Sequence, residues 1–381
     1  MDFSWQPETL EIYEQALKFG ASLGFKGTSE AEFDYQQWAR LGEFGAFGLP
    51  IKEEFGGSGL SALATVKVLE ALGKSVPDTG ILFAGAAHTF ACIMPIYEQG
   101  SDYLLEKYLP SLVSGKRIAA NAISEANAGS DTSKLDTTAQ KDGEYYFLNG
   151  SKSFVTNGSC ATVFIVYATT NPSAGYLGQS VFVLDTEEEA QGLTVAPAYD
   201  KLGLSSAPLN QIVFDHYRIH RKQMIANEGQ GARIFSKSMH WERICLFAIF
   251  LGVLERDIEQ CISYANDRKQ HKKSIGQFQA ISHRIADMKI RLESARWLLY
   301  VAAWKIDQQE VSALDASISK VAISEALVQS GLDIIKIHGG LGYITDSGID
   351  RSLRDGIGST IFSGTNEMQR ELICHRLGLK Q

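Results

Sequence analysis

Hydrophobic periodicity changes twice along this chain, and these two changes constrain its fold more than any other feature. Residues 1–120 carry apolar side chains at helical spacing, as in LEIYEQALKFGASL and ATVKVLEALGKSV. Residues 121–229 contain short β-rich runs, and residues 230–381 return to long helical periodicity. We therefore predict an α+β protein with an N-terminal α-helical domain (1–120), a middle β domain (121–229) and a C-terminal helical bundle domain (230–381).

Local sequence adds detail to this order. YYFLNGSKSFVTNG, TVFIVYATT and QSVFVLDT predict strands, and their Asn-Gly pairs predict strand ends at FLNG and FVTNG. Residues 244–270, 279–306 and 313–337 are each long enough to form a helix of a bundle. Because residues 244–254 are apolar nearly all round, we expect that part to be buried.

Composition excludes several classes of protein. The 381 residues are 45% hydrophobic, enough for a large core, and the net charge of -8 argues against nucleic acid as a partner. The start MDFSWQPETLEIYEQ lacks the features of a signal peptide, and no window holds 18 consecutive apolar residues. The five cysteines are scattered without CxxC spacing. We expect a cytoplasmic protein that binds no nucleic acid, membrane or metal.

Three short motifs point to a ligand, and each has a plain structural alternative. NAISEANAGSDTS (121–133) either brings backbone N–H groups close to a phosphate or flavin, or is an ordinary loop. HGGLGYI (338–344) either cradles a pyrophosphate or ends a helix. The basic residues of DRKQHKKSIGQFQA (267–280) either neutralise a phosphate or form a solvated helix end.

Glu242 is the sharpest catalytic candidate. It stands beside Trp241 at the start of the apolar stretch, where desolvation would raise its pKa and make it a better base near neutral pH. Arg243 would oppose that shift if the two side chains paired. The alternative is a structural Glu–Arg pair at the beginning of a helix.

Taken together, the motifs resemble the acyl-CoA dehydrogenase family over nearly the full length of the chain. The resemblance rests on EEFGGSGLS, KYLPSLVSGK, AISEANAGSDTS, NGSKSFVTNG, NEGQGARIF, DRKQHKKSIGQFQAISHRIADM, IHGGLGYITD and FSGTNEMQR, in the family's order. It implies an N-terminal helical domain, a middle β-barrel-like domain and a C-terminal four-helix bundle. It also implies FAD bound between domains, and a homodimer or homotetramer.

The resemblance further implies where FAD binds. One subunit would supply Asn121, Ile123, Ser124, Gly129 and Ser130, then Phe154, Val155 and Thr156, and finally Thr365 and Glu367. Its neighbour would complete the dinucleotide site with Arg268, His271, Gln279, Lys336, Gly339 and Gly340. His271 and Lys336 depart from the family, which usually has phenylalanine and glutamine there.

Most of the family carries its catalytic glutamate where this chain has Ser363. A minority carries it on the bundle helix just before an arginine, and this chain has Glu242 there. The resemblance therefore implies Glu242 as the base that removes the Cα proton. Ser363 would act through its backbone N–H, which binds the thioester carbonyl together with a ribityl hydroxyl of FAD. Ser130, Trp241 and Arg243 would lie near the substrate.

Within the family, WERICLFAIFLG, TIFSGTNEMQ and GILFAGAAHTFACIMPI are most similar to dehydrogenases of natural-product biosynthesis that act on prolyl groups held by a carrier protein. This implies oxidation of a phosphopantetheine-linked prolyl thioester to a dehydroprolyl or pyrrolyl thioester. One alternative is a short branched-chain acyl-CoA dehydrogenase of the isovaleryl type, and another is a non-catalytic scaffold. An acidic carrier protein needs a basic docking patch, for which residues 220–222 and 268–273 are candidates.

Overall fold

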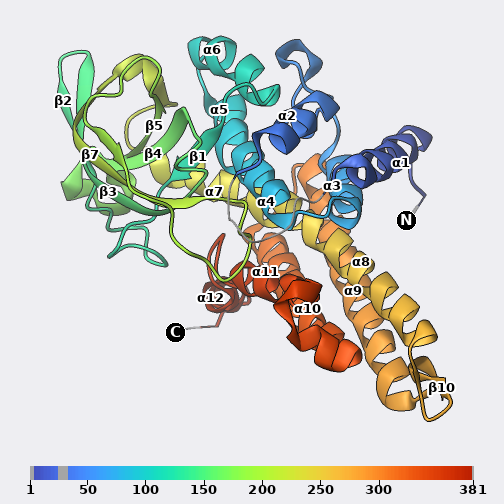
Figure 1. Cartoon of the computed structure of the whole chain (residues 1–381). Helices are drawn as coiled ribbons and strands as arrows, with labels where there is room; N and C mark the ends of the chain where they lie inside the picture. The colour runs from blue at the N-terminus through green and yellow to red at the C-terminus, as the bar shows by residue number, and fades with distance from the viewer. Residues whose placement is uncertain (1–3, 25–32, 380–381) are drawn as a thin grey trace.

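A curved β-sheet lies on one side of the molecule, and helices from the two ends of the chain lie beside it (Figure 1). The computed structural model describes residues 4–24 and 33–379. Within this part of the chain, helices, strands and helices follow one another in the predicted order, so the predicted fold class is confirmed.

The N-terminal helices begin where short polar side chains cap them. Asp34, Ser61 and Asp78 each accept hydrogen bonds from backbone N–H groups in the first turns of α2, α3 and α4. The elements of this region are α1 (Pro7–Ser22), α2 (Tyr35–Phe44), η1 (Glu53–Phe55), α3 (Ala62–Ser75), α4 (Thr79–Ala87), the π-helix η2 (His88–Ile93), α5 (Met94–Gln99) and α6 (Asp102–Val113).

The helices α4, η2 and α5 form one continuous apolar rod, Thr79–Gln99. By length and composition alone this rod could cross a membrane, although 94% of its most apolar window is buried inside the fold. Burial of this kind is typical of a core helix, because the apolar surface is covered by protein. The rod lies at the centre of the molecule, between the sheet and the C-terminal helices (Figure 1).

Eight strands make the sheet of the middle region. They are β1 (Ala119–Ala122), β2 (Thr138–Asp142), β3 (Tyr145–Thr156), β4 (Val163–Thr169), β5 (Gln179–Asp185), β6 (Leu193–Val195), β7 (Leu209–His220) and β8 (Met224–Ile225). Their order is β6-β7-β3-β2-β4-β5-β8, with β1 beside β4. Strand β5 is buried at every position, because its two faces pack on two different apolar cores.

Strand β3 continues through the first Asn-Gly pair, so the strand end predicted at FLNG is wrong. A register shift at Gly150, whose φ is +141°, absorbs the turn sequence as a bulge. The second predicted end, at FVTNG, agrees with the end of β3 at Thr156. A second register shift lies beside Phe154, which has φ +58° and a 63% exposed side chain.

The C-terminal region is built on three long helices that pack together. Its elements are α7 (Gly231–Trp241), the π-helix η5 (Glu242–Leu246), α8 (Ala248–Asp267), β9 (Lys269–Gln270), β10 (Lys273–Ser274), η6 (Ile275–Gln277), α9 (Gln279–Asp307), α10 (Ala313–His338), η7 (Gly339–Tyr343), η8 (Thr345–Ser347), α11 (Arg351–Ser359) and α12 (Asn366–Arg376). The predicted helix 244–270 divides into η5, α8 and a hairpin strand. Residues 244–254 are buried, as predicted.

Candidate functional site

Glu242 lies at a break in helical geometry. It is the first residue of the π-helix η5, between α7 and α8. Single π-turns inside helices occur frequently at functional sites. A second π-helix, η2, packs against η5, and Phe90 of η2 stacks on Trp241 with ring centroids 6.5 Å apart. The sequence places an acid where two irregular helical segments meet.

The fold brings Ser363 onto this acid. The Ser363 hydroxyl donates to Oε1 of Glu242 at 2.5 Å. The neighbouring Arg243 donates from Nε to the Ser363 carbonyl oxygen at 2.9 Å, and no ion pair joins it to Glu242 within the described residues. Arg243 therefore holds the 363 loop, and the alternative of a Glu242–Arg243 structural pair does not describe the contacts.

The Glu242 carboxylate is buried. Burial raises its pKa above the ordinary value, while the Ser363 hydrogen bond and the Arg243 charge act against that rise. Its second oxygen, Oε2, is buried and has no hydrogen-bond partner within the described residues. An acceptor oxygen without a donor in an enclosed site is suited to taking a proton from a bound molecule.

Polar side chains of α10 and α12 hold the loop that carries Ser363. Lys320 is fully buried and donates from Nζ to Asn366 Oδ1 at 2.7 Å, and burial lowers its pKa to about 7. Gln369 donates from Nε2 to the Gly364 carbonyl at 3.1 Å and accepts from Ser317. These contacts fix the backbone on the C-terminal side of Ser363.

Trp241 and the central rod hold the other side of the acid. Trp241 Nε1 donates to Glu98 Oε1 of α5 at 2.8 Å. Phe83 of α4 packs against Phe362, with ring centroids 4.6 Å apart. The rod thus contacts residues immediately before both Glu242 and Ser363.

The same rod binds the strands on which flavin-contacting residues were expected. The Asn157 side chain, just after β3, donates to the Ala84 carbonyl of α4 at 3.0 Å. His88 Nδ1 accepts from the Ala119 N–H at the start of β1 at 2.9 Å. The strands that carry Asn121 and Thr156 are therefore bonded to α4 and η2, which pack against η5, the helix of Glu242.

Several expected flavin contacts are open to a ligand. Asn121 Oδ1 is buried and has no hydrogen-bond partner within the described residues. A Cβ added to Gly129 would meet nothing within 4 Å, and Ser130 beside it is exposed. Thr156 is half-buried, whereas Val155 is buried in the sheet core. Ile123 and Ser124 are half-buried, and Thr365 caps α12 just before the exposed Glu367.

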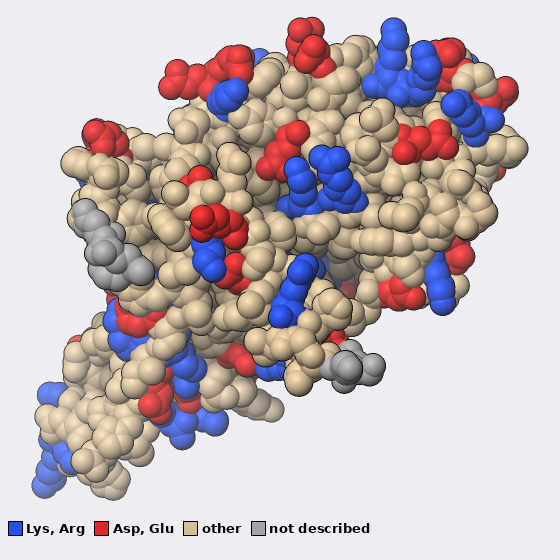
Figure 2. Space-filling view, turned by 180° about the vertical axis from the view of Figure 1, so that it is seen from behind, with Lys and Arg blue, Asp and Glu red and all other residues tan. Residues whose placement is uncertain are grey.

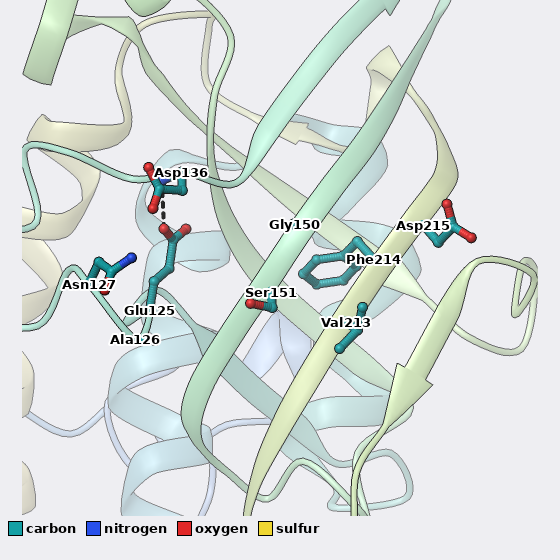
Figure 3. A pocket seen from close by; sticks show the side chains of 9 residues that line it. All are labelled: Glu125, Ala126, Asn127, Asp136, Gly150, Ser151, Val213, Phe214 and Asp215. Atoms are coloured by element: carbon teal, nitrogen blue, oxygen red, sulfur yellow. Dashed lines mark hydrogen bonds between the residues drawn. The ribbon is translucent and has the colours of Figure 1, made fainter.

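The 121–133 loop rests on a buried ion pair. Lys152 Nζ donates to Glu125 Oε1 at 2.6 Å and to the Ile123 carbonyl at 3.0 Å. Beside this pair a hollow of about 590 Å³ opens to solvent (Figure 3). Asp136 and Asp215 line it and no basic side chain does, so it is unsuited to a phosphate group.

The residues expected from a neighbouring subunit lie away from Glu242. Arg268, His271 and Gln279 are exposed around the β9–β10 hairpin, which Figure 1 shows at the far end of α8. Because α8 has 20 residues, that end is about 30 Å from its start. Lys336, Gly339 and Gly340 are exposed at the end of α10, and a Cβ on either glycine would meet nothing within 4 Å. Within one chain these residues do not join the Glu242 site.

Sequence reasoning missed Lys320, Gln369 and the Glu125–Lys152 pair. Lys320 interrupts the apolar periodicity of residues 313–337. A single charged residue on an otherwise apolar helical face could have indicated a buried lysine with a polar partner. No local sequence pattern indicated the hydrogen-bond partners of Gln369 and Glu125, because these contacts join segments that are distant in the sequence.

Family models match three successive parts of the chain. Residues 25–116 match "Acyl-CoA dehydrogenase, N-terminal domain", residues 120–217 match "Acyl-CoA dehydrogenase, middle domain", and residues 229–378 match "Acyl-CoA dehydrogenase, C-terminal domain". Together these matches span most of the sequence.

Individual proteins are similar over nearly the whole chain. The L-prolyl-[peptidyl-carrier protein] dehydrogenase of Pseudomonas fluorescens is 47% identical over 349 residues, which cover 91% of each chain. A crystal structure described as an FAD-dependent dehydrogenase is 56% identical, with a TM-score of 0.95 and 100% of both chains covered. The structure described as PigA with FAD and proline is 44% identical, with a TM-score of 0.96 and the same coverage.

Proposed function

This chain belongs to the acyl-CoA dehydrogenase family and is an FAD-dependent dehydrogenase, and we propose that it oxidises a prolyl thioester on a carrier protein. The product is a dehydroprolyl or pyrrolyl thioester. The observation that carries the proposal is the enclosed carboxylate of Glu242, whose Oε2 makes no hydrogen bond within the described residues. The prolyl assignment is supported by the similarity to the Pseudomonas fluorescens enzyme and to PigA.

In the proposed reaction Glu242 is the base. The C–H bond at the prolyl Cα breaks, and the proton passes to Oε2 of Glu242. A carboxylate with a raised pKa is a stronger base than an exposed one, and burial provides that rise here. The Ser363 hydroxyl holds Oε1, so that Oε2 is the oxygen left to accept the proton.

Ser363 has a second proposed role through its backbone N–H. An N–H aimed at the thioester carbonyl stabilises the negative charge that develops on that oxygen as the proton leaves. The contacts of Arg243 with the Ser363 carbonyl and of Gln369 with the Gly364 carbonyl hold this peptide in place. Phe362 packs on Phe83 beside the site, and we expect these apolar rings to help exclude water from it.

The residues present fit FAD. The unpartnered amide oxygen of Asn121, the open space at Gly129 and the exposed ring of Phe154 are features of a prepared ligand cradle. When bound, FAD would supply the acceptor for the hydride, which leaves the neighbouring Cβ of the prolyl ring so that a Cα–Cβ double bond forms. The contacts proposed from one chain are Asn121, Ile123, Ser124, Gly129, Ser130, Phe154, Val155, Thr156, Thr365 and Glu367.

We propose that a second copy of the chain completes the dinucleotide site. The expected partner contacts are Arg268, His271, Gln279, Lys336, Gly339 and Gly340, which are exposed and lie away from Glu242 in their own chain. An apolar stripe on α9 supports association, since Ile290, Val301 and Trp304 are 63%, 46% and 47% exposed. A homodimer or homotetramer follows, and we expect it in the cytoplasm.

Mass spectrometry of a carrier protein loaded with proline tests the proposed function. The purified enzyme with FAD should lower the mass of the loaded carrier by about 2 Da for the dehydroprolyl product or about 4 Da for the pyrrolyl product, since each two-electron oxidation removes two hydrogens. Turnover of isovaleryl-CoA with no change in the prolyl carrier would instead establish the branched-chain acyl-CoA alternative.

A further inference from the structure

The exposed face of α7, the helix that directly precedes Glu242, carries a basic row. Arg233 and Lys237 are exposed, and His240 is half-buried one turn further on. Spacings of three and four residues place all three on one side of the helix. No ion pair engages Arg233 or Lys237 within the described residues. The positive charges of Arg233 and Lys237 therefore face solvent and are not neutralised by carboxylates of the same chain.

A third cation lies beside this row. Burial lowers the pKa of His240, and the positive charges of Arg243, Arg376 and Lys237 lower it further. Asp315 is the carboxylate that acts on His240 in the opposite direction, and it is already paired with Lys305 at 2.6 Å. Figure 2 shows the back of the molecule, where Lys and Arg side chains gather near the middle of the face.

An exposed apolar residue lies at the other end of the row. Leu177 of η3 (Pro172–Gly178) is 71% exposed, and its carbonyl lies against Gly229, just before α7. Gln179 Nε2 donates to the Thr132 carbonyl at 2.6 Å, which joins η3 to the loop of Ser130. The start of α7, the tip of η3 and this loop thus form one rim.

The rim and the acid are separated by the length of a helix. Helix α7 has 11 residues, so its first residue and Trp241 are about 15 Å apart. A thioester carried on a long flexible arm can span this distance between the rim and Glu242. The arm of a carrier protein leaves as a phosphodiester, and an anion at that point suits Arg233 and Lys237.

We infer that Arg233, Lys237 and Leu177 form the docking surface for a carrier protein with an acidic face around its phosphopantetheine serine. This inference rests on the proposed function, because it names the partner that delivers the substrate to Glu242. Charge complementarity across a rim acts mainly on association, so docking is sensitive to salt and to charge reversal.

The basic run at residues 220–222, the other candidate near the sheet, fits this role less well. Arg221 is paired with Glu144 at 2.6 Å, and Arg218 is paired with Glu189. Lys222 is exposed on η4 (Arg221–Gln223), with its backbone N–H bound to His220. It supplies a matched control, since reversing its charge changes the net charge without touching the α7 row.

The test compares two substrates that share the same prolyl thioester. Wild-type enzyme, R233E/K237E and K222E are assayed with prolyl-carrier protein and with prolyl-pantetheine, which lacks the protein. We expect R233E/K237E to raise KM for the carrier substrate about tenfold and to flatten its salt dependence. Turnover of prolyl-pantetheine should remain unchanged, as should both activities of K222E. The single variants Arg233→Ala and Lys237→Ala repeat the test if the double variant loses its flavin spectrum.

The outcomes distinguish failure of the docking surface from failure of the proposed function. A wild-type KM for the carrier substrate in R233E/K237E, or an equal rise in K222E, would overturn the docking surface while leaving the function intact. Failure of the wild-type enzyme to oxidise either prolyl substrate would overturn the proposed function itself, and the docking inference with it.

Discussion

The Ser363 hydroxyl donates a 2.5 Å hydrogen bond to Oε1 of Glu242, although the two residues are 121 positions apart in the sequence. This bond joins the two positions at which the resemblance to the family implies a catalytic acid. In this chain one position supplies the carboxylate and the other supplies a hydrogen-bond donor to it. The arrangement leaves Oε2 of the carboxylate without a hydrogen-bond partner in the part of the chain that the structure describes, and we propose that this oxygen takes the substrate proton.

The hydrogen bond from Ser363 to Glu242 should affect the pH dependence of turnover. The base must be ionised, so activity falls as the pH drops through the raised pKa of Glu242. Ser363→Ala removes a donor that stabilises the ionised form, which raises the pKa further and moves the acid limb of the kcat profile to higher pH. An acid limb at the wild-type pH in this variant would show that the hydroxyl does not tune Glu242. Ser263→Ala, at an exposed position of α8, is the control.

Lys320 predicts a pH dependence of stability. Its pKa in the folded chain is about 7, against 10.5 for an ordinary lysine, so between these values the unfolded chain binds a proton that the folded chain does not. The free energy of unfolding should therefore rise with pH across this window, by up to about 1.4 kcal/mol per pH unit from this group. Urea titrations of wild type and Lys320→Met check the slope.

Lys320→Met should lose that contribution, whereas the exposed Lys116→Met should keep it. An identical slope in wild type and Lys320→Met would mean that Lys320 stays charged in the fold. The same variant loosens Asn366, so we expect it to lower kcat as well, through the Ser363 loop.

The α9 stripe predicts that assembly and cofactor binding are linked. Val301→Glu/Trp304→Glu puts two charges on a face that we expect to be buried between copies, and it should dissociate the oligomer to monomers. Because the dinucleotide site is proposed to need both copies, the monomer should lose FAD. Analytical ultracentrifugation with absorbance at the flavin band measures both at once. Val195→Glu, at a 37% exposed position on β6, is the control, and a dissociated variant that keeps FAD would contradict the shared site.

Periodicity was sufficient to predict the order of elements. The long helices α9 and α10 begin and end within a residue or two of the predicted ranges 279–306 and 313–337, because an apolar stripe over many turns specifies a helix locally. Burial of residues 244–254 was equally predictable, because a helix that is apolar all round has no polar face to expose to solvent. The bulge at Gly150 was not, because Asn-Gly marks a turn in isolation and pairing with β7 overrides it.

The details of the site were beyond local sequence for a similar reason. The bond between Glu242 and Ser363, and the one between Lys320 and Asn366, each join segments that meet only through packing of the bundle. The sequence indicated an acid with a raised pKa. It left open whether Glu242 pairs with Arg243, and the structure shows that the Arg243 guanidinium donates to the Ser363 carbonyl instead. The roles of Glu242 and of the flavin contacts remain predictions for experiment.

Glu242→Gln tests the central claim most directly. The glutamine keeps an oxygen that accepts the Ser363 hydrogen bond but removes the basic carboxylate, so the variant should bind FAD and retain the flavin absorption spectrum. On rapid mixing with prolyl-carrier protein in the absence of oxygen, bleaching of the flavin band should be roughly 10²- to 10⁴-fold slower than in wild type. Bleaching at a rate close to that of wild type would contradict the assignment of Glu242 as the base.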